Sequence, residues 1–322
     1  MTDTGPLFVS SGDLIADRRY TFALELAGRG ELAGAADILV QTVELAPRFA
    51  TAWLALGAIR DRLGDRDGAI AAFGLARDAD PEDYHGARLQ LARLGSGEAA
   101  PHMSETFVRR LFDQYAARYD AALTDHLHYR GPAILREAVE TVMRTAGRPL
   151  HFGAVLDLGC GTGLGGAAFR SIADRLVGVD LAPAMIAQAT AKCLYDRLVS
   201  AELAEFLAAE GAAAVRYQLV LAADVFVYVN DIAPVIAAVA RVLAPDGLLA
   251  CTFETYSGDG VKLLPTLRFA YSEAYLRAAI AAAGLTPVTL ADASVRTEKG
   301  VPVHGLVLVA GPAAWESHAD QA

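Results

Sequence analysis

The chain has 322 residues, of which 54% are hydrophobic and 20% are charged, with a formal net charge of -10 and a pI of about 5.2. This composition supplies enough apolar side chain for packed cores and excludes a disordered chain. The length predicts two domains of unequal size. The acidic balance opposes attraction to nucleic-acid phosphates or an anionic membrane, so we expect neither as a partner.

The sequence also argues against a secreted protein and against a membrane-spanning one. The opening MTDTGPLFVS lacks the basic residues and apolar run of a secretion signal, and no stretch reaches the roughly 20 uninterrupted apolar residues of a spanning helix. We therefore expect a cytoplasmic protein. The cysteines, Cys160, Cys193 and Cys251, have no metal-binding spacing, which argues against disulfides and a metal site.

Residues 16–83 contain an internal repeat. The segments ILVQTVELAPRF and AFGLARDADPED place Pro47 and Pro81 at equivalent points, and 81 minus 47 is 34, the tetratricopeptide period. The stretch resembles two tetratricopeptide (TPR) repeats followed by a capping helix at about residues 84–94. Because about three repeats are normally needed for a stable stack, we expect this pair to dock on the neighbouring domain, a second copy of the chain or a protein partner.

A linker and two helices follow the repeats. Residues 95–103, GSGEAAPHM, have the small and polar composition of a linker. The segment SETFVRRLFDQYAARYDAAL then predicts a helix capped by Ser104, and a second helix runs from Pro132 to about Thr145. The aromatic and apolar residues of the first helix recur at helical spacing: Phe107, Leu111, Tyr115 and Tyr119.

From Phe152 onward, short apolar strands alternate with helices, which predicts a mostly parallel sheet wrapped by helices. PVTLADASVR and VPVHGLVLVA have too few residues between them for a crossover helix, so they predict a final antiparallel hairpin. The expected fold is α/β, with a seven-stranded Rossmann-like sheet behind a small all-α domain. We divide the chain into a helical repeat domain (1–100), a helical lid that recognises the substrate (101–150) and the sheet domain (151–322).

The glycine-rich segment VLDLGCGTGLGG fits two cofactor-binding patterns. Counting from Gly161 gives the G-x-G-x-x-G of a dinucleotide-binding turn, and counting from Gly159 gives G-x-G-x-G. Asp180, at the end of the second strand, suits ribose hydroxyls in both patterns. The Gly159 register is favoured because it lets AVLDL end at the turn, whereas the other places Gly159 inside the strand. A nicotinamide oxidoreductase remains as an alternative.

The segments VLDLGCGTG, VGVD, AEL and YQLVLAADVFVYV, together with the final hairpin, resemble the class I S-adenosylmethionine-dependent methyltransferases over about residues 104–310. With the repeats ahead of them and the segment FDQYAARYDAALTDHLHYRGP, the chain is similar to bacterial methyltransferases that carry tetratricopeptide repeats before the catalytic domain. The resemblance implies S-adenosylmethionine as cofactor and S-adenosylhomocysteine as product.

The resemblance also implies cofactor contacts. The glycine turn borders the methionine part, Asp157 holds its amino end, Asp180 takes the ribose hydroxyls, and Met185 flanks the adenine, whose edge Glu202 reads. The full expected set is Asp157, Gly159, Cys160, Gly161, Gly163, Asp180, Leu181, Met185, Glu202, Leu203, Asp224, Tyr115 and Tyr119. No Asn-Pro-Pro-aromatic sequence follows the fourth strand, which argues against nucleic-acid bases and glutamine as acceptors.

Methyl transfer from a sulfonium is an in-line displacement, so positioning the acceptor and excluding water supply much of the acceleration. We expect Asp224, His128 and Tyr119 in catalysis; for Asp224 a role in orienting the cofactor or capping a helix is the alternative. Arg268 and Arg296 would either clamp an acceptor carboxylate or be solvated at the surface. The expected acceptor set is Tyr129, Arg130, Glu254, Tyr256, Arg268 and Tyr271.

The leading functional interpretation is a methyltransferase that acts on a small molecule. One alternative is a protein methyltransferase whose repeats recruit the substrate. The other is a non-catalytic regulator that senses S-adenosylmethionine.

Overall fold

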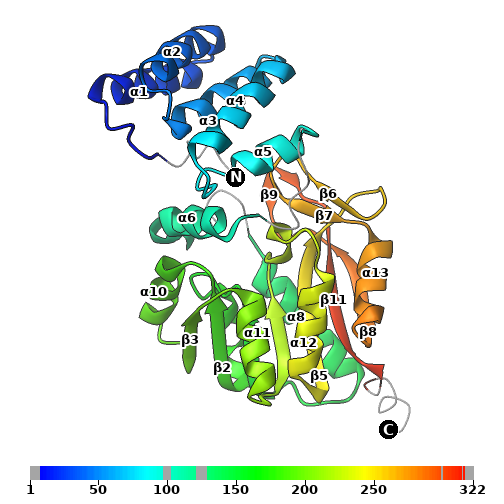
Figure 1. The fold of residues 1–322 in the computed structure, drawn as a ribbon. Coiled ribbons are helices and arrows are strands. Elements are labelled where there is room, and N and C mark those ends of the chain that lie inside the picture. Colours follow the sequence, from blue (N-terminus) through cyan, green and yellow to red (C-terminus); the bar gives the residue numbers. More distant parts are fainter. Residues whose placement is uncertain (1–7, 97–102, 121–128, 299, 314, 316–322) are drawn as a thin grey trace. The chain divides into compact units, whose positions relative to one another are not determined.

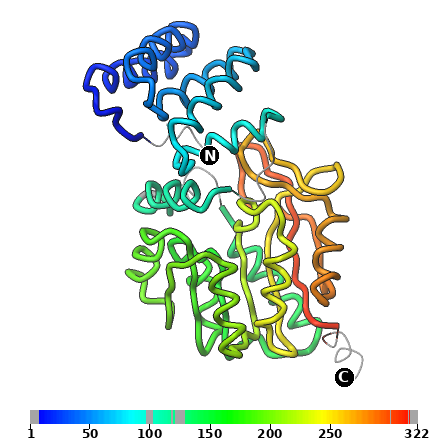
Figure 2. Tube along the Cα trace, viewed as in Figure 1, coloured from blue at the N-terminus to red at the C-terminus, as the bar shows by residue number. Residues whose placement is uncertain are grey.

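The computed structural model describes residues 8–96, 103–120, 129–298, 300–313 and 315 (Figures 1 and 2). The chain forms two compact units, residues 1–110 with 265–267, and residues 111–264 with 268–322. Within the described residues, every helix is too short or too polar to cross a membrane.

The first unit is built from helix pairs, in which α1 packs on α2 and α3 on α4. The turn glycines of the two pairs, Gly30 and Gly64, have φ of +85° and +82°, and 64 minus 30 is again 34. The 34-residue repeat expected from the sequence is therefore present as two helix pairs. The helices are α1 (Leu14–Gly28), α2 (Leu32–Leu45), α3 (Ala50–Arg62), α4 (Arg66–Ala79) and α5 (Ala87–Arg93).

The two helices expected after the linker are α6 (Glu105–Tyr115) and α8 (Gly131–Thr145). The Ser104 hydroxyl accepts the Phe107 N–H at 3.2 Å, which confirms the predicted cap. The first helix is shorter than expected, because α6 ends at Tyr115 and a 3-10 turn, η1 (Ala116–Arg118), follows. Residue His128 lies outside the described residues.

The second unit contains a seven-stranded sheet in the order β3-β2-β1-β4-β5-β11-β8. Strands β1 to β5 are parallel, and β11 pairs antiparallel with both β5 and β8. This confirms the predicted α/β fold and its final hairpin. The strands are β1 (Phe152–Leu158), β2 (Ala173–Asp180), β3 (Arg197–Ser200), β4 (Tyr217–Ala222), β5 (Leu243–Glu254), β8 (Leu285–Ala293) and β11 (Gly305–Pro312).

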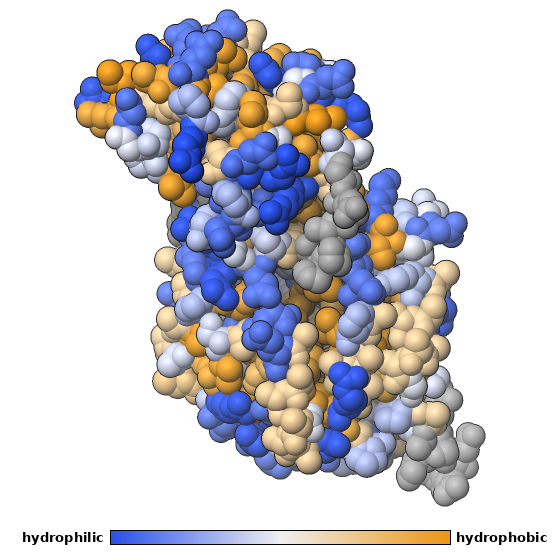
Figure 3. Space-filling view, in the orientation of Figure 1, coloured by the Kyte–Doolittle hydropathy of each residue, from blue (hydrophilic) through white to orange (hydrophobic). Residues whose placement is uncertain are grey.

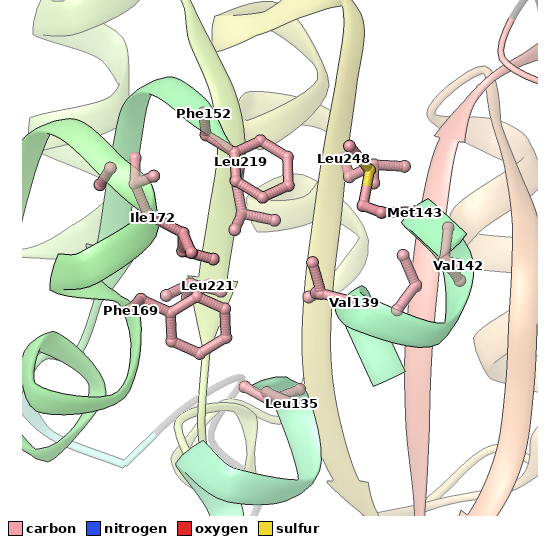
Figure 4. Close-up of a cluster of buried hydrophobic side chains, with 14 of the residues drawn as sticks. Leu135, Val139, Val142, Met143, Phe152, Phe169, Ile172, Leu219, Leu221 and Leu248 are labelled. Carbon is pink, nitrogen blue, oxygen red and sulfur yellow. The ribbon is translucent and has the colours of Figure 1, made fainter. Parts of the chain in front are cut away.

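Helices cover both faces of this sheet. α8 packs on β5, β8 and β11, and α9 (Leu164–Phe169) lies beside it. Figure 4 shows Leu135 and Val139 of α8 facing strand residues such as Leu219 and Leu248, in a core from which water is excluded. The other helices are α10 (Pro183–Ala191), α11 (Leu203–Ala212), α12 (Ala233–Val242) and α13 (Glu273–Ala282).

Two short ribbons were not expected from the sequence: β6 (Val261–Leu263) with β7 (Phe269–Tyr271), and β9 (Thr297–Glu298) with β10 (Val301–Pro302). The strand predicted over residues 301–310 is divided into β10 and β11. The interruption has a physical reason, because residues 301–303 pair with the β9 segment: the Val303 N–H donates to the carbonyl of Arg296 at 3.1 Å, which extends the β9–β10 ladder.

Candidate functional site

The turn between β1 and α9 is rich in glycine. Strand β1 ends at Leu158. Gly159, Gly161 and Gly163 have φ of +60°, +52° and +93°, a backbone conformation that residues other than glycine rarely adopt. Gly166 lies inside α9 and needs no such conformation. The backbone therefore uses the register that starts at Gly159.

The first two glycines of the turn, Gly159 and Gly161, differ in their surroundings. A Cβ on Gly159 would lie 2.6 Å from Cγ2 of Val225, so this position has no room for a side chain. A Cβ on Gly161 would meet nothing within 4 Å. Gly159 is thus required for packing, whereas the face of Gly161 is open to a ligand.

Asp180 closes β2, the strand next to β1, and its carboxylate is fixed against the glycine turn. Its Oδ2 accepts the Gly161 N–H at 2.9 Å and its Oδ1 accepts the Ala182 N–H at 2.8 Å. Burial raises the pKa of Asp180, and these two N–H donors oppose that rise. Each carboxylate oxygen has a second acceptor site, so the group can still receive hydroxyl donors.

A second carboxylate, Asp157, lies on β1 just before the turn, with the side chain buried. Its Oδ2 accepts the hydroxyl of Tyr195 at 2.7 Å. Burial raises the pKa of Asp157 to about 7, although the Tyr195 hydrogen bond lowers it. Sequence reasoning missed Tyr195, because it lies between α10 and β3 and belongs to no motif.

The segment from α6 to η1 is tied to the glycine turn and to α10. Asp113 accepts the Ala184 N–H at 2.9 Å, at the start of α10. Asp120 accepts the Thr162 hydroxyl and the Lys192 ammonium, the latter at 2.6 Å. The buried residues Ala116, Ala182 and Met185 form a small cluster where the two segments meet, and Phe112 and Tyr119 pack against it.

Aromatic rings gather beside this cluster. Phe112 packs edge-on against Tyr119 and Tyr228, with centroid distances of 5.9 Å and 5.2 Å. Burial raises the pKa of Tyr119 and Tyr129, and the charge of Asp224 raises both further. These hydroxyls therefore stay neutral and lie within the electrostatic influence of the Asp224 carboxylate.

Asp224 itself follows β4 in the left-handed region, with φ of +60°. Its N–H donates to Thr252 Oγ1 at 2.9 Å, and its Oδ1 accepts Nη2 of Arg268. Burial lowers the pKa of Arg268, but the neighbouring carboxylates of Asp224 and Glu254, with the Tyr228 hydroxyl, raise it overall. Asp224 is thus one end of a buried ion network.

The network continues through Glu254 at the end of β5. Its Oε1 accepts Nε of Arg268 and Nη1 of Arg296, both at 2.5 Å, and Arg296 also donates to Glu298 at 2.7 Å. The arginine side chains are only 5% and 3% exposed. Surface solvation is therefore wrong for both arginines. The guanidinium groups of Arg268 and Arg296 bind carboxylates of the protein itself. The structure therefore does not show the expected clamp for a carboxylate of the acceptor.

Three other residues expected at the acceptor lie in separate settings. Tyr271 is fully buried and its hydroxyl lies within hydrogen-bonding distance of the carbonyls of Phe226 and Val229, so it supports the turn η3 (Phe226–Tyr228). Its placement there, instead of against an acceptor, corrects the expectation. Tyr256 donates to the Asp259 carbonyl within its own loop. The exposed Arg130 pairs with Glu137 at 3.1 Å.

The remaining residues of the expected cofactor set lie in the glycine turn, directly after β2, at the start of α11 and at the end of α6. Glu202 caps α11, where its Oε2 accepts the Glu205 N–H at 2.9 Å, and Leu203 begins that helix. Cys160 is buried within the glycine turn, where burial raises the pKa of its thiol. Leu181 directly follows Asp180, and Tyr115 is the last residue of α6.

Comparisons with known proteins match part of this chain to methyltransferases. Residues 155–247 match a family model described as a methyltransferase domain. Human methyltransferase-like protein 27 is 34% identical over 101 residues, which are 31% of this chain and 39% of that protein. This chain therefore spans about two fifths of the length of that relative.

The chain is also similar to solved structures. The 1,6-didemethyltoxoflavin-N1-methyltransferase of Burkholderia thailandensis, with bound S-adenosylhomocysteine, is 23% identical, with a TM-score of 0.50 over 67% of this chain and 91% of that one. A magnesium protoporphyrin IX methyltransferase of Synechocystis is 16% identical, with a TM-score of 0.45 over 72% of this chain and 98% of that one.

The fold and the matched residues define a class I, Rossmann-like methyltransferase domain, preceded by a helical region. The cofactor of this class is S-adenosylmethionine. The match covers the glycine turn, Asp180 and Asp224, and it favours this interpretation over the nicotinamide alternative.

Proposed function

We propose that this chain transfers a methyl group from S-adenosylmethionine to a small-molecule acceptor. The observation that carries the proposal is the glycine turn with the Asp180 carboxylate fixed beside it at 2.9 Å from the Gly161 nitrogen, inside the matched methyltransferase domain. The Burkholderia thailandensis enzyme of the same fold has a small heterocyclic acceptor bound, which supports an acceptor of this size.

The charges of the site fit the proposed cofactor. S-adenosylmethionine supplies, when bound, a methyl group on a cationic sulfur and also carries an ammonium group. The buried carboxylate of Asp157, the half-buried carboxylate of Asp180 and the rings of Phe112 and Tyr119 suit such a ligand. In this proposal the glycine turn borders the methionine part, Asp157 faces its ammonium group, and Asp180 accepts the ribose hydroxyls.

The adenine end of the cofactor would lie beside α10 and α11. Met185 is 1% exposed and packs in the cluster that Phe112 and Tyr119 cover. Glu202 and the backbone of Leu203 stand at the start of α11, within reach of an adenine edge in this proposal. Leu181, Cys160 and Tyr115 complete the proposed contacts.

We further propose that residues 101–150 act as the lid of this site. The α6 to η1 segment is held to α10 through Asp113 and to the glycine turn through Asp120. In this proposal the segment held at Asp113 and Asp120 excludes water from the sulfur and holds the acceptor in line, which is the main requirement of this displacement.

The roles of the catalytic candidates follow from their partners. Asp224 is engaged by Arg268, so its proposed role is to orient the cofactor and the acceptor through the neighbouring Tyr119 and Tyr129 hydroxyls. A general base is needed only if the acceptor must lose a proton. Of the expected acceptor set, Glu254 and Arg268 serve by holding Asp224 in place.

A direct test is calorimetric titration of the full chain with S-adenosylmethionine and S-adenosylhomocysteine, followed by an acceptor panel in which release of S-adenosylhomocysteine is measured. Binding together with turnover of a small acceptor supports the proposal. Binding without turnover on small or protein acceptors would instead indicate the sensing regulator.

A second candidate, methylation of a protein acceptor, is favoured by the surface of the first unit. Figure 3 shows apolar residues over its helices, and the large exposed ones within the described part of this unit are Phe8, Val9, Leu14, Ile15, Phe22, Leu45, Leu63 and Leu75. Apolar side chains gathered in this way mark contact surfaces. We propose that the helix pairs are TPR repeats that bind a protein partner or a second copy of the chain.

The two candidates differ in their response to a change on this surface. The double variant Leu14→Glu with Phe22→Glu places charges on α1 and leaves the second unit untouched. If the acceptor is a small molecule, its turnover is unchanged. If the repeats recruit a protein acceptor, methylation of that protein falls while cofactor affinity stays the same.

A further inference from the structure

The ring of Tyr195 occupies space that two glycines leave free. A Cβ on Gly166 would lie 2.6 Å from Cε2 of Tyr195, and a Cβ on Gly178 would lie 2.9 Å from its Cε1. Neither glycine has a positive φ: Gly166 lies in α9 and Gly178 in β2. Backbone conformation therefore does not explain these two glycines. The Tyr195 ring fills the space beside Gly166, and beside Gly178 it shares the space with Leu198 Cδ2 at 2.8 Å and Cys160 Sγ at 3.0 Å.

The hydroxyl of Tyr195 connects the two elements that flank the glycine turn. It donates to Asp157 Oδ2 on β1 at 2.7 Å, and it accepts the Gly166 N–H of α9 at 2.9 Å. Gly166 belongs to the first turn of α9, where N–H groups have no partner within the helix. A single oxygen thus fixes the Asp157 carboxylate relative to the start of α9.

We propose that Tyr195 is a positioning residue for the cofactor, which orients the Asp157 carboxylate toward the cofactor's ammonium group and favours its ionised form. This inference rests on the proposed function, because it assigns the ammonium group of S-adenosylmethionine to Asp157. Tyr195 itself contacts Asp157 and not the cofactor, so its effect on binding is indirect.

The surroundings of Asp157 make its charge depend on this hydroxyl. The groups that act on it are Tyr195, Asp180, Cys160 and Tyr129, and none of these described groups is a cation. Burial and the charge of Asp180 raise the pKa of Asp157, whereas the Tyr195 hydrogen bond lowers it. Loss of the hydroxyl would therefore keep Asp157 protonated to a higher pH.

The test is the variant Tyr195→Phe, which keeps the ring and removes the hydroxyl. S-adenosylhomocysteine, which retains the ammonium group, is titrated calorimetrically between pH 5.5 and 9. At pH 7 we expect binding weaker by on the order of 10-fold, as for loss of a hydrogen bond to a charged group. The midpoint of the pH dependence should move to higher pH, and the difference from the wild type should shrink at pH 9.

Tyr217→Phe is the matched control. Tyr217 also donates from a buried position to a carboxylate, Glu210, at 2.6 Å, but it lies at the first residue of β4, away from the strand ends that carry the site. It should lower stability without changing the affinity or its pH midpoint. A similar effect of both variants would indicate a merely structural role for Tyr195 and overturn the inference.

A double variant tests whether Tyr195 acts through Asp157. Asp157→Asn should remove the pH dependence, and adding Tyr195→Phe to it should cause little further loss of affinity. Gly166→Ala pushes the ring while keeping the hydroxyl, because the three atoms nearest to that Cβ all belong to Tyr195, and it should move the midpoint in the same direction.

The failure of this inference and that of the proposed function are distinguishable. Wild-type protein that does not bind S-adenosylhomocysteine contradicts the proposed function. Wild-type binding with an unchanged affinity and pH midpoint in Tyr195→Phe contradicts only the role of Tyr195.

Discussion

Arg268 and Asp224 form an ion pair that is buried at both ends, with side chains 5% and 11% exposed. The two residues come from different loops, one between β6 and β7 and one directly after β4. Because Glu254 holds the same guanidinium at 2.5 Å, the pair fixes a residue whose backbone is in a strained, left-handed conformation. The network thus supports the geometry of the proposed site more than it supplies a charge to an acceptor.

Removing this guanidinium should be costly. Arg268→Met leaves the carboxylates of Asp224 and Glu254 with Arg296 as their remaining shared guanidinium, 3.6 Å from Asp224 and 2.5 Å from Glu254. The free energy of unfolding should therefore fall by about 3 kcal/mol. Urea denaturation measures the change. Arg277→Met is the control, because Arg277 pairs with Glu273 at 2.7 Å on the surface and should cost less than about 1 kcal/mol. Equal losses in the two variants would contradict the role of the network.

Alanine at Gly161 separates backbone strain from loss of ligand space. Gly161 and Gly260 have φ of +52° and +71°, and neither has an atom within 4 Å of a Cβ position. Gly161→Ala and Gly260→Ala should therefore lower stability by a similar amount, about 1 kcal/mol. Only the first places a methyl group on the proposed cofactor face, so only it should weaken S-adenosylhomocysteine binding in calorimetry. Unaltered binding by Gly161→Ala would place the cofactor elsewhere.

Asp157 should give the stability a specific pH dependence. Its pKa is about 7 in the folded protein and 3.8 as the ordinary value, so the folded state retains the proton as pH rises and the unfolded state loses it first. The contribution of this group to stability is therefore present below about pH 4 and is lost as pH rises toward 7. Denaturant titrations of the wild type and Asp157→Asn should show a difference that changes across this window and then levels off; a constant difference would contradict the assignment.

The contacts of Asp120 should slow cofactor release. Asp120→Asn weakens the bonds to Lys192 and Thr162, which hold the lid segment to the glycine turn. Because the ammonium contact is partly solvent-exposed, we expect dissociation of S-adenosylhomocysteine to be only about threefold faster. Stopped-flow displacement measures this rate. Asp78→Asn, which breaks the exposed pair with Arg77 in the first unit, is the control and should leave it unchanged.

Local signals in the sequence account for the parts of the fold that were predicted. Ser104 caps a helix where the sequence places it. The position of Gly159 at the end of an apolar strand gave the register of the turn, which the positive φ values confirm. The position of Asp180 beside the turn was predictable too, because it ends the second strand and parallel strands end at one edge of the sheet.

The ion network and Tyr195 had no comparable signal. Arg268 and Arg296 reach Glu254 only because the short ribbons β6–β7 and β9–β10 bring their loops to the sheet edge, and strands of two or three residues have no detectable periodicity. Tyr195 lies in a connection, and its partner Asp157 is 38 residues away. The one trace in the sequence was Gly178, a glycine within a strand, which marks a close approach of another group.

The proposed cofactor site is tested by calorimetric titration of S-adenosylhomocysteine into the wild type and Asp180→Ala. We expect one site per chain in the wild type and binding weakened by about tenfold or more in the variant, because the ribose hydroxyls lose a charged acceptor. Absence of binding in the wild type, or equal affinity in both proteins, would contradict the proposed site.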